Sequence, residues 1–285
     1  MNTIKTYIQL TKPGIIMGNT ITAAAGFMLA SRNSFNPWLF LAALGGLALI
    51  VAAGCVLNNY MDREADKKMA RTQNRALAKG EISVRSALIY AIVLLIAGSC
   101  LTLYANLLTL LIALSGFIIY VFFYGYLKYR TMYGTEIGSI AGAVPPVVGY
   151  TAVTGHLDGG AFLVFLIIAL WQMPHFFAIA LYRSKEYAAA SIPVLPLVKG
   201  IAATKIRMVL YTLAFIASTF LLTFFGYTGY AYLVIAAILG LTWLALCIKG
   251  FKALSTEKWA HKMFRYSLVV VTLLCIMISI DSIKH

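Results

Sequence analysis

The chain has 285 residues, of which 61% are hydrophobic and only 11% are charged, and it carries a formal net charge of +14. Soluble proteins are about 45–50% apolar and about 25% charged, so this composition excludes a water-soluble enzyme. It also excludes a disordered chain, because disorder requires low hydrophobicity. The positive charges lie between long apolar runs, which favours anionic lipid or a phosphorylated substrate over nucleic acid as the partner.

Long apolar runs follow one another along the whole chain. A membrane-spanning helix needs roughly 20 apolar residues, and runs of that length predict spans near 13–31, 37–58, 84–103, 106–126, 134–154, 160–182, 207–226, 229–249 and 264–281. We therefore expect an all-α polytopic integral membrane protein, in which residues 1–285 form a single domain of nine transmembrane helices. The first apolar stretch is long and more spans follow it, so we expect an uncleaved helix there instead of a signal peptide.

The basic residues predict the orientation of this bundle. Short connections follow the odd-numbered spans, whereas the connections after spans two, four, six and eight carry the charges, and 21 of the 23 Lys and Arg residues fall on that side. Only Arg32 and Lys284 fall on the other side. By the positive-inside rule the basic side is cytoplasmic, with the amino terminus inside, the carboxyl terminus outside, and the active-site loops on the cytoplasmic face.

The four cysteines have no spacing typical of a metal site or a disulfide framework. They each fall within an apolar run, at Cys55, Cys100, Cys247 and Cys275. We interpret them as small buried apolar residues.

A polar motif ends the second span, in the sequence Asn-Asn-Tyr-Met-Asp-Arg-Glu-Ala-Asp at 58–66. At 100° per residue, Asn58, Asp62 and Asp66 share one face of a helix. Ionised carboxylates at a membrane boundary are costly without compensation, and Mg²⁺ typically binds one or two carboxylates together with phosphate oxygens. The alternative interpretation is a solvated helix end whose acids pair with neighbouring basic residues.

Basic residues follow the acidic motif at four-residue steps, at Lys67, Arg71, Arg75 and Lys79. They form a stripe if the segment stays helical, and Arg side chains suit phosphate oxygens. A positive-inside loop would also place basic residues here. The acids and the stripe together predict a diphosphate site.

A second polar region ends the sixth span. Pro174 lacks an amide hydrogen and is expected to kink the helix or free a carbonyl beside His175. Tyr182 and Glu186 follow His175 by seven and eleven residues, which places all three on nearly one helical face. A lone membrane histidine is more often hydrogen-bonded to another helix, but its position here favours a site.

Other polar and aromatic residues are weaker candidates. We interpret His156, His261 and His285 as solvated. Tyr120, Tyr124 and Tyr182 can line a pocket and stabilise positive charge, although interfacial aromatic belts explain most membrane tyrosines. The pair Pro145-Pro146 predicts a broken helix in span five.

In these motifs the sequence resembles the intramembrane aromatic prenyltransferase superfamily and, within it, the protohaem IX farnesyltransferase family, whose members are also called haem O synthases. The resemblance spans nearly the whole chain and rests on the blocks at 58–66, 71–72, 75–77, 11–15, 127–131, 141–146, 171–175 and 192–196. The Pro-His block separates the haem enzymes from quinone and chlorophyll relatives, which have a second Asp-rich motif near that place. Two departures are Glu186, where the family commonly has Asp, and Ala76, where many members have Pro.

The resemblance implies transfer of a farnesyl group from farnesyl diphosphate to a vinyl group of haem b with addition of water, which gives haem O and diphosphate in the cell inner membrane. It implies that Asn58, Asp62 and Asp66 are catalytic and hold Mg²⁺, and that His175 binds haem, either through iron or by shaping the pocket. It further implies diphosphate or propionate contacts by Arg71, Arg75, Lys128 and Arg130. A second polar cluster comprises Tyr182, Arg183, Lys185 and Glu186. The implied partners are the bilayer and haem-handling or terminal oxidase assembly proteins, with no nucleic acid.

Two rival functions stay open on the residues alone. One is a prenyltransferase that acts on a quinone precursor or another aromatic acceptor, and the Pro-His block argues against it. The other is a transporter, which would place ionisable groups near the bilayer centre. Because nearly all the charges here cluster at one interface, the sequence favours an enzyme.

Overall fold

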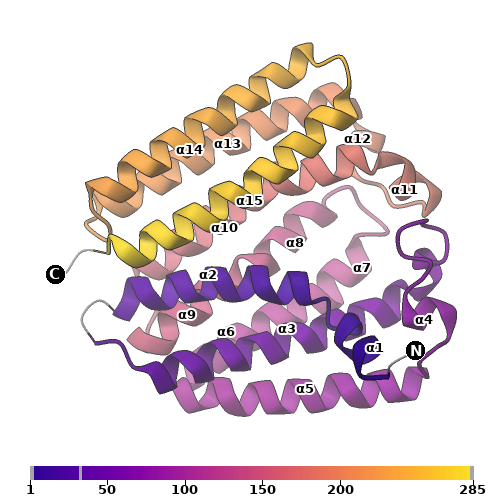
Figure 1. Cartoon of the computed structure of the whole chain (residues 1–285), viewed down its shortest axis with the longest axis horizontal. Coiled ribbons are helices and arrows are strands. Elements are labelled where there is room, and N and C mark those ends of the chain that lie inside the picture. Colours follow the sequence, from indigo (N-terminus) through magenta and orange to yellow (C-terminus); the bar gives the residue numbers. More distant parts are fainter. Residues whose placement is uncertain (1–2, 32–33, 283–285) are drawn as a thin grey trace.

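A computed structural model describes residues 3–31 and 34–282, and the chain within these ranges is helical (Figure 1). Nine of its helical segments are long and apolar enough to cross a membrane, which confirms the expected bundle. Six are single helices: α2 (Pro13–Ser31), α3 (Pro37–Asp66), α5 (Val84–Ala105), α10 (Gly159–Tyr182), α13 (Gly200–Phe224) and α15 (Thr256–Ile280).

The other three spans are composite. The fourth joins α6 (Leu107–Ile118), a π-helical turn η1 (Ile119–Tyr124) and α7 (Gly125–Leu127). The fifth joins α8 (Gly134–Gly142) to α9 (Val144–Thr154), and the eighth joins α14 (Tyr230–Lys249) to η2 (Gly250–Lys252). The break between α8 and α9 confirms the prediction made from Pro145-Pro146, whereas α10 continues through Pro174.

Short helices occupy the charged end of the bundle, namely α1 (Thr3–Leu10), α4 (Ala76–Lys79), α11 (Ser184–Ala189) and α12 (Leu195–Val198). In Figure 1 they lie at the end where α1 starts, together with α7, and α15 ends at the opposite end. The long helices therefore bring the loops rich in Lys and Arg to one end of the molecule.

Polar side chains start several of the long helices where the apolar runs begin. Asn36, Ser83, Asp158 and Ser255 each accept a hydrogen bond from a backbone N–H in the first turn of α3, α5, α10 and α15. These bonds satisfy amide groups that have no partner within the helix. The helix starts are thus determined locally, by a polar residue directly before an apolar run.

Close packing between helices depends on small residues, as is typical of membrane proteins. The helices α2 and α9 cross so closely that a Cβ at Gly149 would lie 1.9 Å from the carbonyl oxygen of Ala23. The helices α3 and α5 approach similarly at Gly46, where a Cβ would lie 2.8 Å from the backbone nitrogen of Thr102. These contacts hold α2 against α9 and α3 against α5.

Three boundaries differ from the expected spans by more than three residues. The second span runs to Asp66 instead of residue 58, the seventh begins at Gly200 instead of 207, and the last begins at Thr256 instead of 264. Charged residues do not end these helices, because their side chains lie at the end of the bundle, where water solvates some, such as Glu257, and polar partners hold others, such as Lys205. Cys100 is also exposed on the outside of α5, whereas the other three cysteines are buried, and all four are free thiols.

Candidate active site

A cavity of about 890 Å³ lies within the helix bundle. Residues of α2, α3, η1, α8, α10 and α15 line it. Its wall is charged where Lys12, Asp62, Asp66, Arg75 and Lys128 meet at the loop-rich end. Aliphatic and aromatic side chains line the rest, namely Leu47, Ile50, Phe117, Ile168, Leu268 and Val271 among others. The cavity therefore suits an amphiphile with an anionic head and a long apolar body.

The predicted acidic face lies on this cavity. Asn58, Asp62 and Asp66 occupy successive turns at the end of α3 and all three line the cavity wall. Tyr129 donates its hydroxyl to Oδ1 of Asp62 at 2.7 Å, and Lys128 forms an ion pair with the same oxygen. Oδ2 of Asp62 makes no hydrogen bond among the described residues, so it is available to a ligand.

Asp66 is held differently. Its side chain is only 2% exposed, and Arg75 donates to both of its carboxylate oxygens, at 2.9 and 2.7 Å. Thr72 also donates to the Asp66 backbone carbonyl, so the loop after α3 folds back over the helix end. The basic stripe predicted for residues 67–79 is therefore wrong, because the chain turns at Lys67 and brings only Arg71 and Arg75 to the cavity.

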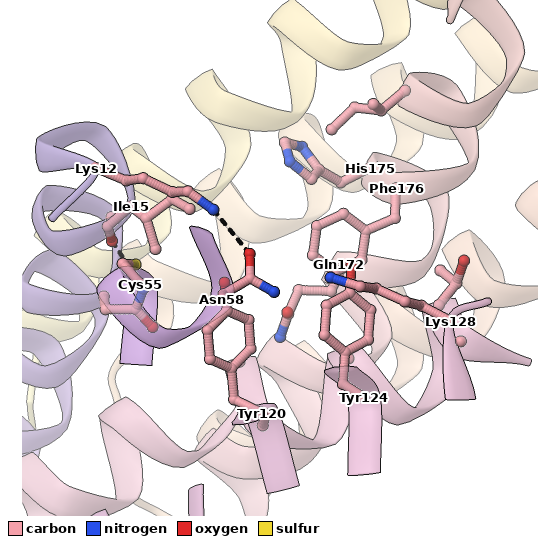
Figure 2. A pocket seen from close by; sticks show the side chains of 18 of the residues that line it. Lys12, Ile15, Cys55, Asn58, Tyr120, Tyr124, Lys128, Gln172, His175 and Phe176 are labelled. Carbon is pink, nitrogen blue, oxygen red and sulfur yellow. Dashed lines mark hydrogen bonds between the residues drawn. The ribbon is translucent and has the colours of Figure 1, made fainter. Parts of the chain in front are cut away.

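Lys12 enters the same site from the junction of α1 and α2. Figure 2 shows its side chain directed at Asn58, whose Oδ1 accepts a hydrogen bond from Nζ at 2.8 Å. Burial lowers the pKa of Lys12 to about 8. Its φ of 53° is left-handed, a conformation that non-glycine residues rarely adopt and that costs about 1–2 kcal/mol. A strained backbone thus places a destabilised ammonium group on the site.

Lys12 differs from the other cations on the cavity wall. Arg75 pairs with Asp66 and Lys128 with Asp62, while Arg71 and Arg183 both pair with Glu186, at 3.5 and 3.3 Å. Among the Lys and Arg residues that line the described cavity, Lys12 alone lacks a carboxylate ion pair. Burial also lowers the pKa of Lys128 and raises that of Tyr129, which keeps the phenol a donor toward Asp62.

Aromatic rings border the charged end on two sides. Tyr120 and Tyr124 of η1 stack with ring centroids 5.7 Å apart, and Lys128 lies 5.1 Å from the Tyr124 centroid. On the opposite side His175 of α10 stacks on Trp171 at 4.8 Å. Figure 2 shows the tyrosines and His175 on facing sides of the space beside Asn58.

The rest of the second polar region is divided between two helices. Because α10 ends at Tyr182, Glu186 lies on α11, and the expectation that it shares a helical face with His175 is wrong. Tyr182 and Arg183 line the cavity, and Glu186 lies behind them as the partner of two arginines. Lys185 is exposed and is not among the described residues that line the cavity.

Arg130 and His261 lie in environments that differ from the expected ones. Arg130 lies over the ring of Tyr126, 3.9 Å from its centroid, and is not part of the described cavity wall. His261 was expected to be solvated, but it is half-buried and stacks on Tyr182 at 3.9 Å. His156 is exposed, as expected, and His285 lies outside the described residues, as do Arg32 and Lys284.

Sequence reasoning missed two residues of the site, Lys12 and Tyr129, as functional groups. Lys12 was visible as the basic residue directly before Pro13 and the first apolar run, and Tyr129 as the neighbour of Lys128. Neither spacing indicates a contact, because each residue reaches α3 from a distant part of the chain.

The arrangement determines which ligands suit the site. Among the described residues, no three acidic, histidine or cysteine side chains form a metal site by themselves. A divalent cation bound at Asp62 and Asp66 would therefore require oxygens from another molecule, such as the phosphates of a substrate. The neighbouring Lys and Arg groups suit the same phosphates.

Comparison with known families and sequences gives a consistent result. The profile of the UbiA prenyltransferase family matches residues 19–269. The chain is 53% identical over 282 residues to a protoheme IX farnesyltransferase of Protochlamydia amoebophila, an alignment that covers 99% of this chain and 100% of the relative. It is 52% identical over 285 residues to the protein of that name from Yersinia pseudotuberculosis, with 99% and 96% covered.

Solved structures with the same fold are more distant in sequence. A digeranylgeranylglyceryl phosphate synthase superposes with a TM-score of 0.82 at 19% identity, over 100% of both chains. A UbiA homologue from Aeropyrum pernix gives 0.76 at 17% identity, over 93% of this chain and 97% of that one. A UbiA homologue from Archaeoglobus fulgidus, bound to GPP and Mg²⁺, gives 0.65 at 16% identity, over 96% and 99%.

Proposed function

The chain belongs to the UbiA prenyltransferase family, and from this membership we propose that it transfers the farnesyl group of farnesyl diphosphate to a vinyl group of haem b. One observation carries the proposal. A single cavity has a charged end, and apolar side chains line the rest of it. The relatives named protoheme IX farnesyltransferase supply the identities of donor and acceptor. The bonding changes convert farnesyl diphosphate, haem b and water into haem O and diphosphate.

Both substrates are amphiphiles that fit such a cavity. At about 0.8 kcal/mol per buried CH₂, burial of a farnesyl chain contributes on the order of 10 kcal/mol. Haem is likewise apolar except for its propionate edge. The charged heads of both molecules would therefore meet the cationic end of the cavity, with their apolar parts among the aliphatic and aromatic side chains.

A magnesium ion fits the donor set at the end of α3. Asn58, Asp62 and Asp66 would hold it, since they offer oxygen atoms on one helix face and Oδ2 of Asp62 has no hydrogen bond among the described residues. The UbiA homologue from Archaeoglobus fulgidus is bound to GPP and Mg²⁺, which supports a site of this kind here. When bound, the ion supplies positive charge that neutralises the diphosphate oxygens.

The cations of the chain stabilise the leaving group. As the allylic carbon–oxygen bond breaks, its electron pair goes to the diphosphate, where Lys12, Arg71, Arg75 and Lys128 stabilise the developing negative charge. These groups come from three segments of the chain, since Arg71 and Arg75 share the loop after α3, and all four line the cavity.

The aromatic rings of Tyr120 and Tyr124 stabilise the farnesyl cation. The faces of Tyr120 and Tyr124 border the space next to the diphosphate residues and can stabilise positive charge. The allylic carbon then bonds to the terminal vinyl carbon of haem, and water adds to the other vinyl carbon with loss of a proton. The apolar wall limits the entry of other water, which would convert the cation to farnesol.

The acceptor lies toward α10 and α15 in this proposal. His175 contacts haem, and Arg183 and Tyr182 lie where a propionate can meet a cation and a phenol. Lys185 and Arg130 lie outside the described cavity wall, which argues against direct contact of either residue with the substrates. Glu186 orients Arg71 and Arg183 through its two ion pairs.

We also propose an orientation in the membrane. The cavity's charged end carries the basic loops, so by the positive-inside rule it faces the cytoplasm of a bacterial cell, with the enzyme in the inner membrane. The amino terminus is then cytoplasmic and the carboxyl terminus lies outside. Accessibility labelling of single cysteines introduced into the loop at 67–75 and into the loop at 155–158 tests this arrangement.

The reaction is tested by incubating the purified protein with haem b, farnesyl diphosphate and Mg²⁺ and analysing the products by mass spectrometry. Farnesylated, hydrated haem supports the proposal, and its absence alongside a prenylated quinone precursor would favour the rival acceptor class. Asp62→Asn should abolish Mg²⁺-dependent turnover in a protein that still inserts and purifies. Glu64→Gln is the matched control, since Glu64 lies on the same helix but its side chain is 68% exposed. Near-normal activity of Asp62→Asn would refute the metal assignment.

A further inference from the structure

The contact between His175 and Ser267 determines where the imidazole carries its proton. His175 on α10 and Ser267 on α15 are both buried, and Nδ1 lies 2.7 Å from the serine Oγ. The same Oγ lies 2.6 Å from the carbonyl oxygen of Phe264, one turn earlier on α15. Oγ therefore has two short contacts, one with a nitrogen and one with an oxygen.

A serine hydroxyl has one proton and can donate one hydrogen bond. The carbonyl of Phe264 has no proton, so an oxygen–oxygen distance of 2.6 Å requires that the hydroxyl proton lies between these two atoms. Oγ must then accept from the ring, and the proton of a neutral imidazole lies on Nδ1. The other ring nitrogen, Nε2, carries a lone pair.

The surroundings keep this ring neutral and oriented. No described carboxylate forms an ion pair with His175. Trp171 stacks on the ring at 4.8 Å with an interplanar angle of 25°, and its Nε1 donates to the backbone carbonyl of Ser267 at 2.9 Å. Phe264 covers another side at 5.1 Å. The ring is therefore fixed between α10 and α15.

Nε2 is the free end of this arrangement. It makes no hydrogen bond among the described residues, and His175 is part of the cavity wall. Figure 2 shows the ring beside the open space between Asn58 and Gln172. Histidines that bind metals usually donate their other N–H to an oxygen atom, which fixes the tautomer and the ring orientation. In this chain Ser267 supplies the oxygen atom, and Nδ1 of His175 donates to it.

We propose that Ser267 is a positioning residue that holds His175 as the Nδ1–H tautomer, so that Nε2 coordinates the iron of the haem substrate. This inference rests on the proposed function, because it takes haem b as the acceptor. An axial bond from α10 fixes the height of the porphyrin in the cavity and holds one of its faces against the wall formed by α10 and α15. The bond also distinguishes haem from a porphyrin without iron.

The test compares the binding of ferric haem b with that of metal-free protoporphyrin IX, for the purified wild-type protein and its variants. Ser267→Ala should weaken haem b binding about 10–100-fold, which is the usual effect of removing such a partner, and should leave protoporphyrin binding unchanged. Ser267→Thr keeps the hydroxyl and should restore haem affinity. Ser218→Ala is the matched control, because Ser218 is also buried and donates to the carbonyl of Phe215 but has no histidine partner.

A second readout starts from the wild-type protein, so its main result does not depend on the folding of variants. The electron paramagnetic resonance and absorption spectra of bound ferric haem should indicate an axial histidine nitrogen, and His175→Ala should lose this signature. Wild-type spectra without nitrogen ligation, or an equal loss of haem and protoporphyrin affinity in Ser267→Ala, would overturn the proposal. Farnesylation of haem without the histidine signature would leave the proposed function intact and refute this inference. The signature without any farnesylated product would refute the proposed function alone.

Discussion

Replacing Lys12 with methionine should make the protein more stable and its active site weaker. Methionine has an unbranched stem of similar length but no charge, so the change removes the ammonium group and leaves the left-handed backbone. At neutral pH the ammonium of Lys12 is held in a buried position against a neutral amide, the Oδ1 of Asn58. We expect the change to raise stability and to weaken anion binding, because the free-energy cost of burying this charge is offset only when an anion binds.

The size of the stability gain follows from the pKa of Lys12. Burial lowers this pKa from 10.5 to about 8, which corresponds to about 3 kcal/mol by which folding disfavours the charged form. The folded state releases its proton at lower pH than the unfolded state, so the penalty applies in full below pH 8 and disappears as the pH rises toward 10.5. Lys12→Met should therefore be up to about 3 kcal/mol more stable than wild type at pH 7 and nearly equal to it above pH 10.5.

The size of the binding loss follows from the hydrogen bond that the ammonium would donate to a phosphate oxygen. Charged hydrogen bonds contribute about 1.5–3 kcal/mol, so the affinity for inorganic diphosphate in the presence of Mg²⁺ should fall roughly 10–100-fold. Denaturant titrations in detergent at pH 7 and pH 10.5 measure the first effect, and calorimetric titration with diphosphate measures the second. Lys5→Met is the control, since Lys5 is exposed on α1 and is not part of the cavity wall.

Three results would refute this reasoning. If Lys12→Met were less stable than wild type at pH 7, or if its advantage persisted unchanged at pH 10.5, the buried charge would not be the source of the cost. If diphosphate bound equally well to both proteins, Lys12 would have no role in binding it. Comparing Lys12→Gly with Lys12→Ala isolates the backbone, because these variants differ only by a Cβ and glycine adopts a φ of 53° without strain.

Two other changes test the ion pairing and the helix packing. Arg75→Met leaves the carboxylate of Asp66, 2% exposed, without the Nη1 group that donates to both of its oxygens, and should lower the free energy of unfolding by about 3–5 kcal/mol; an unchanged denaturation midpoint would contradict this. Gly149→Ala places a Cβ 1.9 Å from the carbonyl oxygen of Ala23, so it should force α2 and α9 apart and cost about 1–3 kcal/mol or more. Gly45→Ala is its control, since the added Cβ would meet only a methyl group at 3.9 Å, and equal stability of the two variants would refute the packing argument.

The nine spans could be predicted because apolar runs of membrane length have few alternatives to a helix. The helix ends could not, since hydropathy falls at the first charged residue whereas a helix can continue into the interface with its charges solvated. The start of α15 shows this at Glu257 and Lys258, which are exposed. At the end of α3 ion pairs take the place of water, because Asp62 and Asp66 lie within the helix and pair with Lys128 and Arg75.

The acidic face of the site could be predicted because its three members lie on one helix, where spacing determines direction. The basic partners could not be predicted in the same way. Arg75 reaches Asp66 only because the loop reverses, and Lys128 reaches Asp62 from the end of a different span. Lys12 depends on a left-handed backbone that no propensity indicates. Contacts between distant segments are set by packing, and one sequence alone does not specify them.

The ion pairs of Asp62 and Asp66 affect how metal and diphosphate bind to the site. In the ligand-free site Asp62 and Asp66 already have cationic partners, so a free diphosphate must compete with these carboxylates for Lys128 and Arg75. A divalent cation alone must likewise compete with the same Lys and Arg groups for the carboxylates. Diphosphate and metal together satisfy both sets, because the metal takes the carboxylate oxygens while the phosphates take the cations. Each ligand therefore removes the competition that the other meets, and their affinities must be coupled in the same sense and to the same extent.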